Sequence, residues 1–241
     1  MSGFAAAFHA ADVAALALFV ALWARIEAML RPGRDRPPST GELMAEWRLR
    51  WMATAAGRDN RIVDGQLIAA LRGGVALMLS SSLIALGGAI ALIGRADQVA
   101  SVAADLAGEA TAPRGAWTAK LLLVIAVLAA AFLHFVWSHR QFGHALVMLG
   151  AIPNDHRGAE AQAVAARAGR LNVLAARSFN RGLRAVYFAL AGLAWLVGPL
   201  ALALASGATF WVLYRREFLS ETRKALLSEP ALAAEPPENA P

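Results

Sequence analysis

The feature that most constrains the fold is a long apolar run from Leu183 to Tyr214, in which Arg184 is the only residue with a formal charge. Arginines stand immediately outside both ends of the run. As one helix the run would reach roughly 48 Å, which exceeds the ~30 Å hydrocarbon core of a bilayer. We therefore predict a membrane-spanning helix that tilts or bends, and Gly198-Pro199 is the expected bend because proline removes a backbone donor.

Composition supports a membrane environment for the whole chain. Hydrophobic residues make up 58% of the sequence and charged residues 17%, whereas a soluble domain carries about 25% charged residues. The formal net charge is +6, and nearly all of the basic residues are arginine. Such an excess fits contact with anionic lipid headgroups. The chain contains no recognised nucleic-acid-binding module, so we expect membrane lipids as partners and no nucleic acid.

Metal, cofactor and catalytic chemistry have little support in the sequence. The absence of cysteine excludes disulfides and thiolate ligands. His134, His139 and His144 are five residues apart, so on one helix each is turned about 140° from the last and they cannot converge on one metal. Ser138 and His139 are adjacent and would point about 100° apart, and no hydrolase, metalloprotease or phosphate-loop motif is present. We predict no metal and no cofactor, and a non-enzymatic protein is favoured although catalysis stays open.

Three further apolar segments read as membrane spans. With the final run they give spans at about residues 5–24, 75–93, 120–137 and 183–214. The predicted fold is an all-α integral membrane protein, a four-helix transmembrane bundle with additional amphipathic or cytoplasmic helices. Residues 1–222 form one membrane domain, and the proline- and glutamate-rich residues 223–241 form a disordered tail.

The segment after the first span carries its own helix signal. Ser39 and Glu42 are three residues apart, as in a capping box, and predict a helix over about 42–56. Trp47 and Trp51 fall on its apolar side. Two interpretations stay open: the helix lies in the membrane interface, or it packs on another helix in the cytoplasm.

The small and polar residues within the predicted spans each allow a structural and a functional interpretation. Asp12 is either a helix cap at the interface or an intramembrane acid with a function, and His9 is expected at the interface. The second span contains serines and a glycine pair, which form either a packing surface or a polar path through the bundle. The residues of this packing or path hypothesis are Ser80, Ser81, Ser82, Gly87, Gly88, Gly198 and Pro199.

A basic stripe is predicted on an alanine-rich helix over residues 158–181 and its continuation. At 100° per residue, five arginines fall within an arc of about 100°. They are Arg167, Arg170, Arg177, Arg181 and Arg184. Lipid phosphates are the expected counterpart, at about 1 kcal/mol per basic residue near the surface. A solvated face, or pairing with acids of residues 42–64, is an equally tenable reading.

The distribution of basic residues predicts an orientation. Nine Lys and Arg lie in residues 25–72 and seven in residues 140–184, against three in residues 95–120. By the positive-inside rule, four spans then place both basic segments in the cytoplasm and both termini on the periplasmic side.

Several motifs together resemble a known family. They are RIVDGQLI at 61–68, SSSLIALGGAIALIG at 80–94, HFVWSHRQF at 134–142, GAIP at 150–153, and FNRGLRAVYFALAGLAWLVGP with VLYRREFLS within 179–220. The sequence is similar to the membrane family called domain of unknown function 599 over about residues 10–222. The resemblance implies a four-span protein, in bacteria one of the inner membrane, and supplies no reaction or ligand. It draws attention to the polar positions Arg61, Asp64, Gln66, Trp137, Ser138, Arg140, Gln141, Asn180, Arg184, Tyr187 and Arg216.

Two functions follow from these patterns. The first is a non-enzymatic helical bundle that assembles with itself or with a membrane partner and contacts anionic lipid through its arginines. The second is a small transporter or channel whose path is lined by the serines of the second span, Gly198-Pro199 and Asp12. Charged residues are nearly absent from the middle of every span, which argues against ion coupling.

Overall fold

The computed structural model describes residues 8–33, 36–95, 98, 101, 114–154 and 158–228, and this part of the chain contains helices and no strand. The all-helical prediction is therefore confirmed for the described residues. The helices are α2 (Ala10–Met29), α3 (Thr40–Ala56), α4 (Ile62–Ile93), α6 (Arg114–Gly150), α7 (Ala159–Leu193), a short 3-10 turn η1 (Ala194–Leu196), α8 (Pro199–Phe218) and α9 (Glu221–Leu227).

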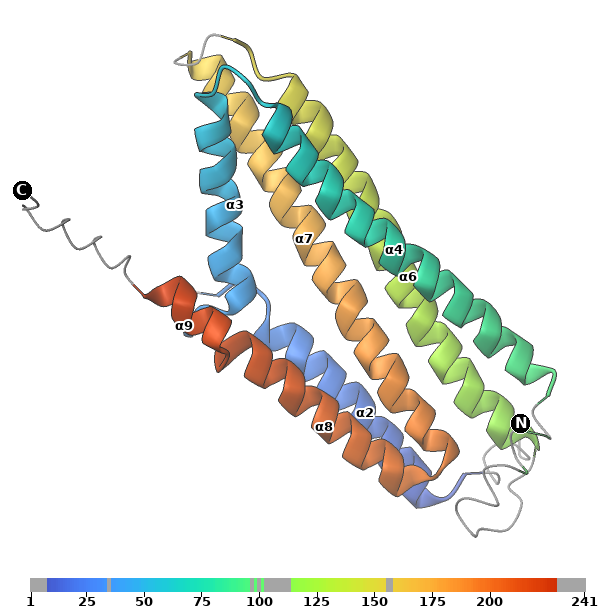
Figure 1. Ribbon diagram of the computed structural model, residues 1–241. Coiled ribbons are helices and arrows are strands. Elements are labelled where there is room, and N and C mark those ends of the chain that lie inside the picture. The colour runs from blue at the N-terminus through green and yellow to red at the C-terminus, as the bar shows by residue number, and fades with distance from the viewer. Residues whose placement is uncertain are drawn as a thin grey trace, which may run out of the picture.

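Helix α7 is the centre of the bundle (Figure 1). Long helix α6 packs along it, and α4 packs on α6. At one end of α7 the short helix α3 covers it, and at the other end α2 and α8 run beside one another. Helix α7 therefore extends from the α3 end of the molecule to the α2 and α8 end.

The run from Leu183 to Tyr214, predicted as one bent helix, is a helical hairpin. Helix α7 ends at Leu193, the 3-10 turn follows, and α8 begins at Pro199 and returns along the bundle (Figure 1). Gly198 has φ +156°, a conformation that L side chains rarely adopt, and Pro199 occupies the first turn of α8, where no donor is needed. The Gly-Pro pair therefore ends one helix and starts another, so the prediction of a single span was wrong.

Compared with the single helix predicted from the sequence, the hairpin also changes the end of the bundle at which α8 finishes. Asp12, near the start of α2, accepts a hydrogen bond from Trp195 Nε1 at 2.8 Å, beside the α7–α8 turn. Helix α8 ends at the other end of the bundle, where Thr40 Oγ1 donates to the Glu217 carbonyl at 3.0 Å. The start of α2 and helix α9 thus lie at opposite ends of the bundle (Figure 1).

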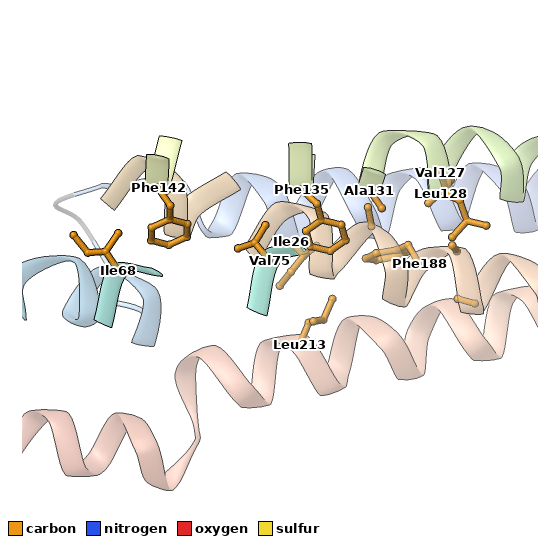
Figure 2. Close-up of a cluster of buried hydrophobic side chains, with 14 of the residues drawn as sticks. Ile26, Ile68, Val75, Val127, Leu128, Ala131, Phe135, Phe142, Phe188 and Leu213 are labelled. Atoms are coloured by element: carbon orange, nitrogen blue, oxygen red, sulfur yellow. The ribbon is translucent and has the colours of Figure 1, made fainter. Parts of the chain in front are cut away.

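Aromatic side chains fill the core where α2, α6, α7 and α8 meet (Figure 2). Phe188 is fully buried, stacks on Trp23 with centroids 5.6 Å apart and meets the edge of Phe19 at 5.5 Å. Phe135 lies against Gly182, and a Cβ added to this glycine would approach the phenyl ring to 2.7 Å. Gly182 is therefore what lets α6 and α7 approach closely.

The remaining predicted boundaries have mixed outcomes. The capping box is confirmed, because Ser39 N donates to Glu42 Oε2 at 2.8 Å and Glu42 N donates to Ser39 Oγ at 3.3 Å. Helix α3 packs on α7, as in the second of its two interpretations. Residues 223–227, predicted to belong to the disordered tail, are part of α9. Residues 5–7 of the first span and residues 229–241 of the tail lie outside the described part.

Among the residues that the structure describes, two helices are long and apolar enough to cross a membrane, Ile62–Ile93 and Gly115–Gly150. More generally, the bundle divides into two halves by charge. Asp, Glu, Lys and Arg are absent from residues 13–24, 73–94, 121–139 and 185–214. These segments lie together in the half that contains α2, α8 and the α7–α8 turn (Figure 1). We call this part the charge-free half, and the part with α3 and the adjoining ends of α4, α6 and α7 the arginine-rich half.

Candidate ligand cleft

A cleft of about 1430 Å³ separates α4 from α2, α3 and α8, with α7 as its floor. This exceeds the 300–1,000 Å³ typical of small-molecule sites. Along α7 it runs from Val173 to Tyr187, about 21 Å at 1.5 Å per residue. The cleft is therefore long enough for an extended ligand.

One wall of the cleft is apolar and belongs to α4. Val63, Leu67, Leu71 and Leu77 line it and remain exposed to the cleft or its mouth. Helix α4 has its main packing partner in α6, so the wall that faces α2, α3 and α8 across the cleft is not covered by a closely packed helix of the described chain. An apolar wall of this extent favours an apolar or amphipathic occupant.

The other walls are rich in arginine. Seven arginines line the cleft, against three glutamates. The arginines are Arg31, Arg48, Arg58, Arg177, Arg181, Arg184 and Arg216, and the glutamates are Glu27, Glu42 and Glu217. Glu42 already pairs with Arg36 at 3.1 Å. The walls therefore carry a positive excess that favours an anion.

Arg48 is the most unusual of these arginines. Its NH1 donates to Asn172 Oδ1 at 2.5 Å, and burial lowers the pKa of the Arg48 guanidinium. Asn172 is fully buried, and its Nδ2 has no hydrogen-bond partner within the described residues. A desolvated cation whose observed partner is a neutral amide lacks the negative charge that would stabilise it.

At the level where the two halves meet, α2, α7 and α8 are joined by charged side chains. Arg184 Nε and NH2 donate to the two Glu27 carboxylate oxygens at 2.7 and 2.9 Å. Arg181 Nε lies 3.9 Å from the same carboxylate. Arg216 NH1 donates to Tyr187 OH at 2.6 Å. Bidentate geometry fixes α2 against α7 here.

The turn between α3 and α4 is held by two buried polar groups. The Arg61 guanidinium donates to four backbone carbonyls, those of Ala55, Ala56, Ile152 and Pro153, at 3.0–3.2 Å. These carbonyls lie at the end of α3 and just beyond the end of α6, where a helix leaves acceptors unsatisfied. The fully buried Asp64 accepts hydrogen bonds from Trp51 Nε1 at 2.6 Å and from Arg58 NH1. Both groups position the α3 wall relative to α4.

The five arginines of the predicted stripe have different surroundings. Arg167, Arg170, Arg177 and Arg181 are exposed, whereas Arg184 is buried. Only three of them, Arg177, Arg181 and Arg184, line the cleft. The carboxylate that Arg184 contacts is Glu27, rather than an acid of residues 42–64.

The predicted packing or path residues do not line one common space. Ser80, Ser81, Gly87 and Gly88 are exposed on α4, and nothing lies within 4 Å of a Cβ added at either glycine. Ser82 is buried and donates to the Leu79 carbonyl at 2.8 Å. Gly198 and Pro199 form the α7–α8 turn, and His9 caps α2 with its backbone N bonded to Asp12 Oδ2 at 3.3 Å.

The other polar positions suggested by the family resemblance lie mainly between α6 and α7. Ser138 Oγ donates to the Ala175 carbonyl at 2.8 Å. The Gln141 amide bonds Ser178 Oγ at 2.8 Å and accepts from Trp137 Nε1 at 3.0 Å. The Arg140 guanidinium lies 5.9 Å from the Trp137 ring centre. Asn180 lines the cleft, while Gln66 is exposed on α4.

Two cleft residues, Arg48 and Glu27, and the buried partner of Arg48, Asn172, were not predicted as site residues. Arg48 and Asn172 are 124 positions apart, and Glu27 and Arg184 are 157 apart. No local spacing links such pairs. The one available signal was that Glu27 lies three residues beyond an uncharged segment, where an unpaired acid would be costly.

These features define the class: an all-helical bundle with a charge-free half and an arginine-lined cleft. No group of three or more His, Asp or Glu side chains that could hold a metal occurs within the described residues. A family model described as "Protein of unknown function, DUF599" matches residues 14–222. The chain therefore belongs to that family, as its motifs predicted. No curated protein and no solved structure matches the chain.

Proposed function

We propose that this protein is a non-enzymatic integral membrane bundle that binds anionic lipid on the cytoplasmic side of the membrane. The charge-free half lies in the hydrocarbon, and the arginine-rich half projects from it. In bacteria the membrane is the inner one. The protein acts by presenting a basic surface and the cleft to lipid, alone or assembled with a partner.

The observation that carries this proposal is the separation of charge along the bundle. Large apolar side chains are fully accessible on the charge-free half, including Ile84 at 76% and Leu200 at 72% exposure. A water-exposed surface of this kind would be strongly unfavourable, whereas lipid is a suitable solvent for it. At its boundary the charges of Arg72, Arg140 and Arg216 begin, which is where headgroups would lie.

The proposed orientation has the start of α2 outside and α9 in the cytoplasm. Because α7 and α8 form a hairpin, the chain passes through the charge-free half an odd number of times. Helix α3 and the exposed arginines of α7 then lie on the side of α9, in agreement with the positive-inside rule. This arrangement replaces the prediction of two periplasmic termini.

The experiment compares lipids that co-purify with the protein from a membrane of mixed composition. We expect alkaline carbonate to leave the protein in the membrane pellet, and anionic lipid to be enriched over zwitterionic lipid in the detergent-solubilised protein. A triple variant, Arg167→Gln with Arg170→Gln and Arg181→Gln, should reduce that enrichment severalfold. Glu46→Gln with Glu160→Gln is the matched surface control. Release by carbonate, or unchanged enrichment in the triple variant, contradicts the proposal.

A further inference from the structure

We propose that the cleft is a binding site for a single anionic phospholipid, whose headgroup phosphate is bound beside Arg48 and whose acyl chains lie along α4. This inference rests on the proposed function and makes it specific. The exposed arginines would contact many lipids weakly at the surface. The cleft, in contrast, would hold one lipid and retain it.

The first step is the charge of the headgroup. Arg48, Arg177 and Arg216 line the cleft and have no carboxylate within salt-bridge distance in the described part of the chain. Arg48 is in addition desolvated, with Asn172 Oδ1 as its observed hydrogen-bond acceptor. A phosphate oxygen at this point would supply the missing counter-charge.

The second step is the apolar wall. Val63, Leu67 and Leu71 of α4 are successive contacts on one face of the helix, and all three are at least 36% exposed. A soluble anion at Arg48 would leave this wall in water. Acyl chains would cover this wall, and the removal of its apolar surface from water would favour binding.

The third step is continuity with the membrane. The cleft extends to Leu77, Met78 and Leu213, which belong to the charge-free segments of α4 and α8. Its length of about 21 Å along α7 is of the same order as the ~15 Å thickness of the chains of one leaflet together with a headgroup. A phospholipid can therefore enter sideways from the cytoplasmic leaflet, with no passage of its chains through water.

The experiment uses the full chain in nanodiscs of phosphatidylglycerol and phosphatidylcholine, followed by gentle release and native mass spectrometry. We expect one retained phosphatidylglycerol per chain in the unaltered protein. Arg48→Gln should lower its occupancy at least tenfold. Arg50→Gln, an exposed arginine two residues away on α3, should leave occupancy unchanged and is the matched control.

A second variant tests the apolar wall independently of folding around Arg48. Leu67→Glu places a carboxylate on a residue that is 49% exposed, so the bundle itself should tolerate it. We expect loss of the retained lipid by a similar factor. Inorganic phosphate without lipid should not raise the thermal midpoint of the detergent-purified protein, since a free anion lacks the chains that the wall binds.

The outcomes separate this inference from the proposed function. Less than a twofold change in Arg48→Gln, equal retention of phosphatidylcholine, or protection by inorganic phosphate alone would overturn the single-lipid site. Anionic enrichment that depends on Arg167, Arg170 and Arg181 would still support the broader proposal. Release of the protein by carbonate would instead remove both.

Discussion

The two halves of the bundle are stabilised by different chemistry although the same helices run through both. In the charge-free half, aromatic side chains of α2 pack around Phe188 of α7, and no charged side chain interrupts the segments. In the arginine-rich half, α3 and α7 meet closely at Gly169, which lies against Leu49 and Met52, and polar side chains make long-range bonds. The difference indicates that the first half depends on packing and the second on partners for its charges.

This contrast is the reason that we place the proposed ligand in one half only. The aromatic cluster needs no further partner, because apolar side chains are stabilised by close packing alone. Cations that are removed from water require counter-charge. Among the cleft arginines, the buried Arg184 has Glu27 and the exposed Arg58 has Asp64, whereas the partly buried Arg48 has the neutral amide of Asn172. The variants below test each half, beginning with the largest expected effect.

Phe188→Ala should be the most damaging change. It removes a fully buried ring that touches both Phe19 and Trp23, and the cavity left behind should cost about 3–5 kcal/mol of unfolding free energy. Denaturant titration in detergent measures the loss. Leu190→Ala, on the same helix but 59% exposed, is the control and should change little. Equal losses in both variants would show that the charge-free half does not depend on this cluster.

Glu27→Gln should have the next largest effect, at the boundary of the halves. The change leaves Arg184, which is buried, without its bidentate carboxylate, and hydrogen bonds to charged groups contribute about 1.5–3 kcal/mol. The same denaturant titration measures the loss of unfolding free energy. In the double variant with Arg184→Gln the loss should be smaller than the sum of the two single losses. Strict additivity would mean that the two side chains do not interact.

Asp64→Asn should weaken the arginine-rich half more mildly. The amide oxygen of asparagine still accepts from Trp51 Nε1 and Arg58, so only the charge assistance is lost, and we expect about 1 kcal/mol. Thermal unfolding with and without salt measures the change. Glu46→Gln, exposed on α3, is the control. A loss as large as that of Phe188→Ala would contradict the assignment of packing to one half and charge to the other.

Gly87→Ala should have the smallest effect, and it should be stabilising. Nothing lies within 4 Å of the added Cβ, and alanine is favoured over glycine within a helix by up to about 1 kcal/mol. Native mass spectrometry reports the subunit number at the same time. If the predicted self-assembly uses the small residues of α4, the number of subunits falls in Gly87→Leu. An unchanged number removes this face from the assembly hypothesis.

The sequence predicted the parts of the fold that local patterns determine. Serine and glutamate three residues apart defined the start of α3, and hydropathy located the C-terminal part of α4 and the middle of α6. The sequence-based prediction failed at Gly198-Pro199, because the same two residues can produce either a kink within one helix or a turn between two helices. The packing of α8 against α2 selects the turn. The cleft was also beyond reach, since Arg48 meets Asn172 only once α3 and α7 have packed.

Labelling of single cysteines in cells tests the arrangement of the two halves, and the cysteine-free chain needs no background substitutions. Ser101→Cys and Ser228→Cys each introduce an exposed thiol. Ser101 follows α4 in the sequence and Ser228 follows α9, so the proposed arrangement places the two thiols on opposite sides of the membrane. With an impermeant maleimide, we expect Ser101→Cys to react in intact cells and Ser228→Cys to react only after the membrane is permeabilised. Reaction of both from the same side would contradict the α7–α8 hairpin and the division of the bundle at the membrane surface.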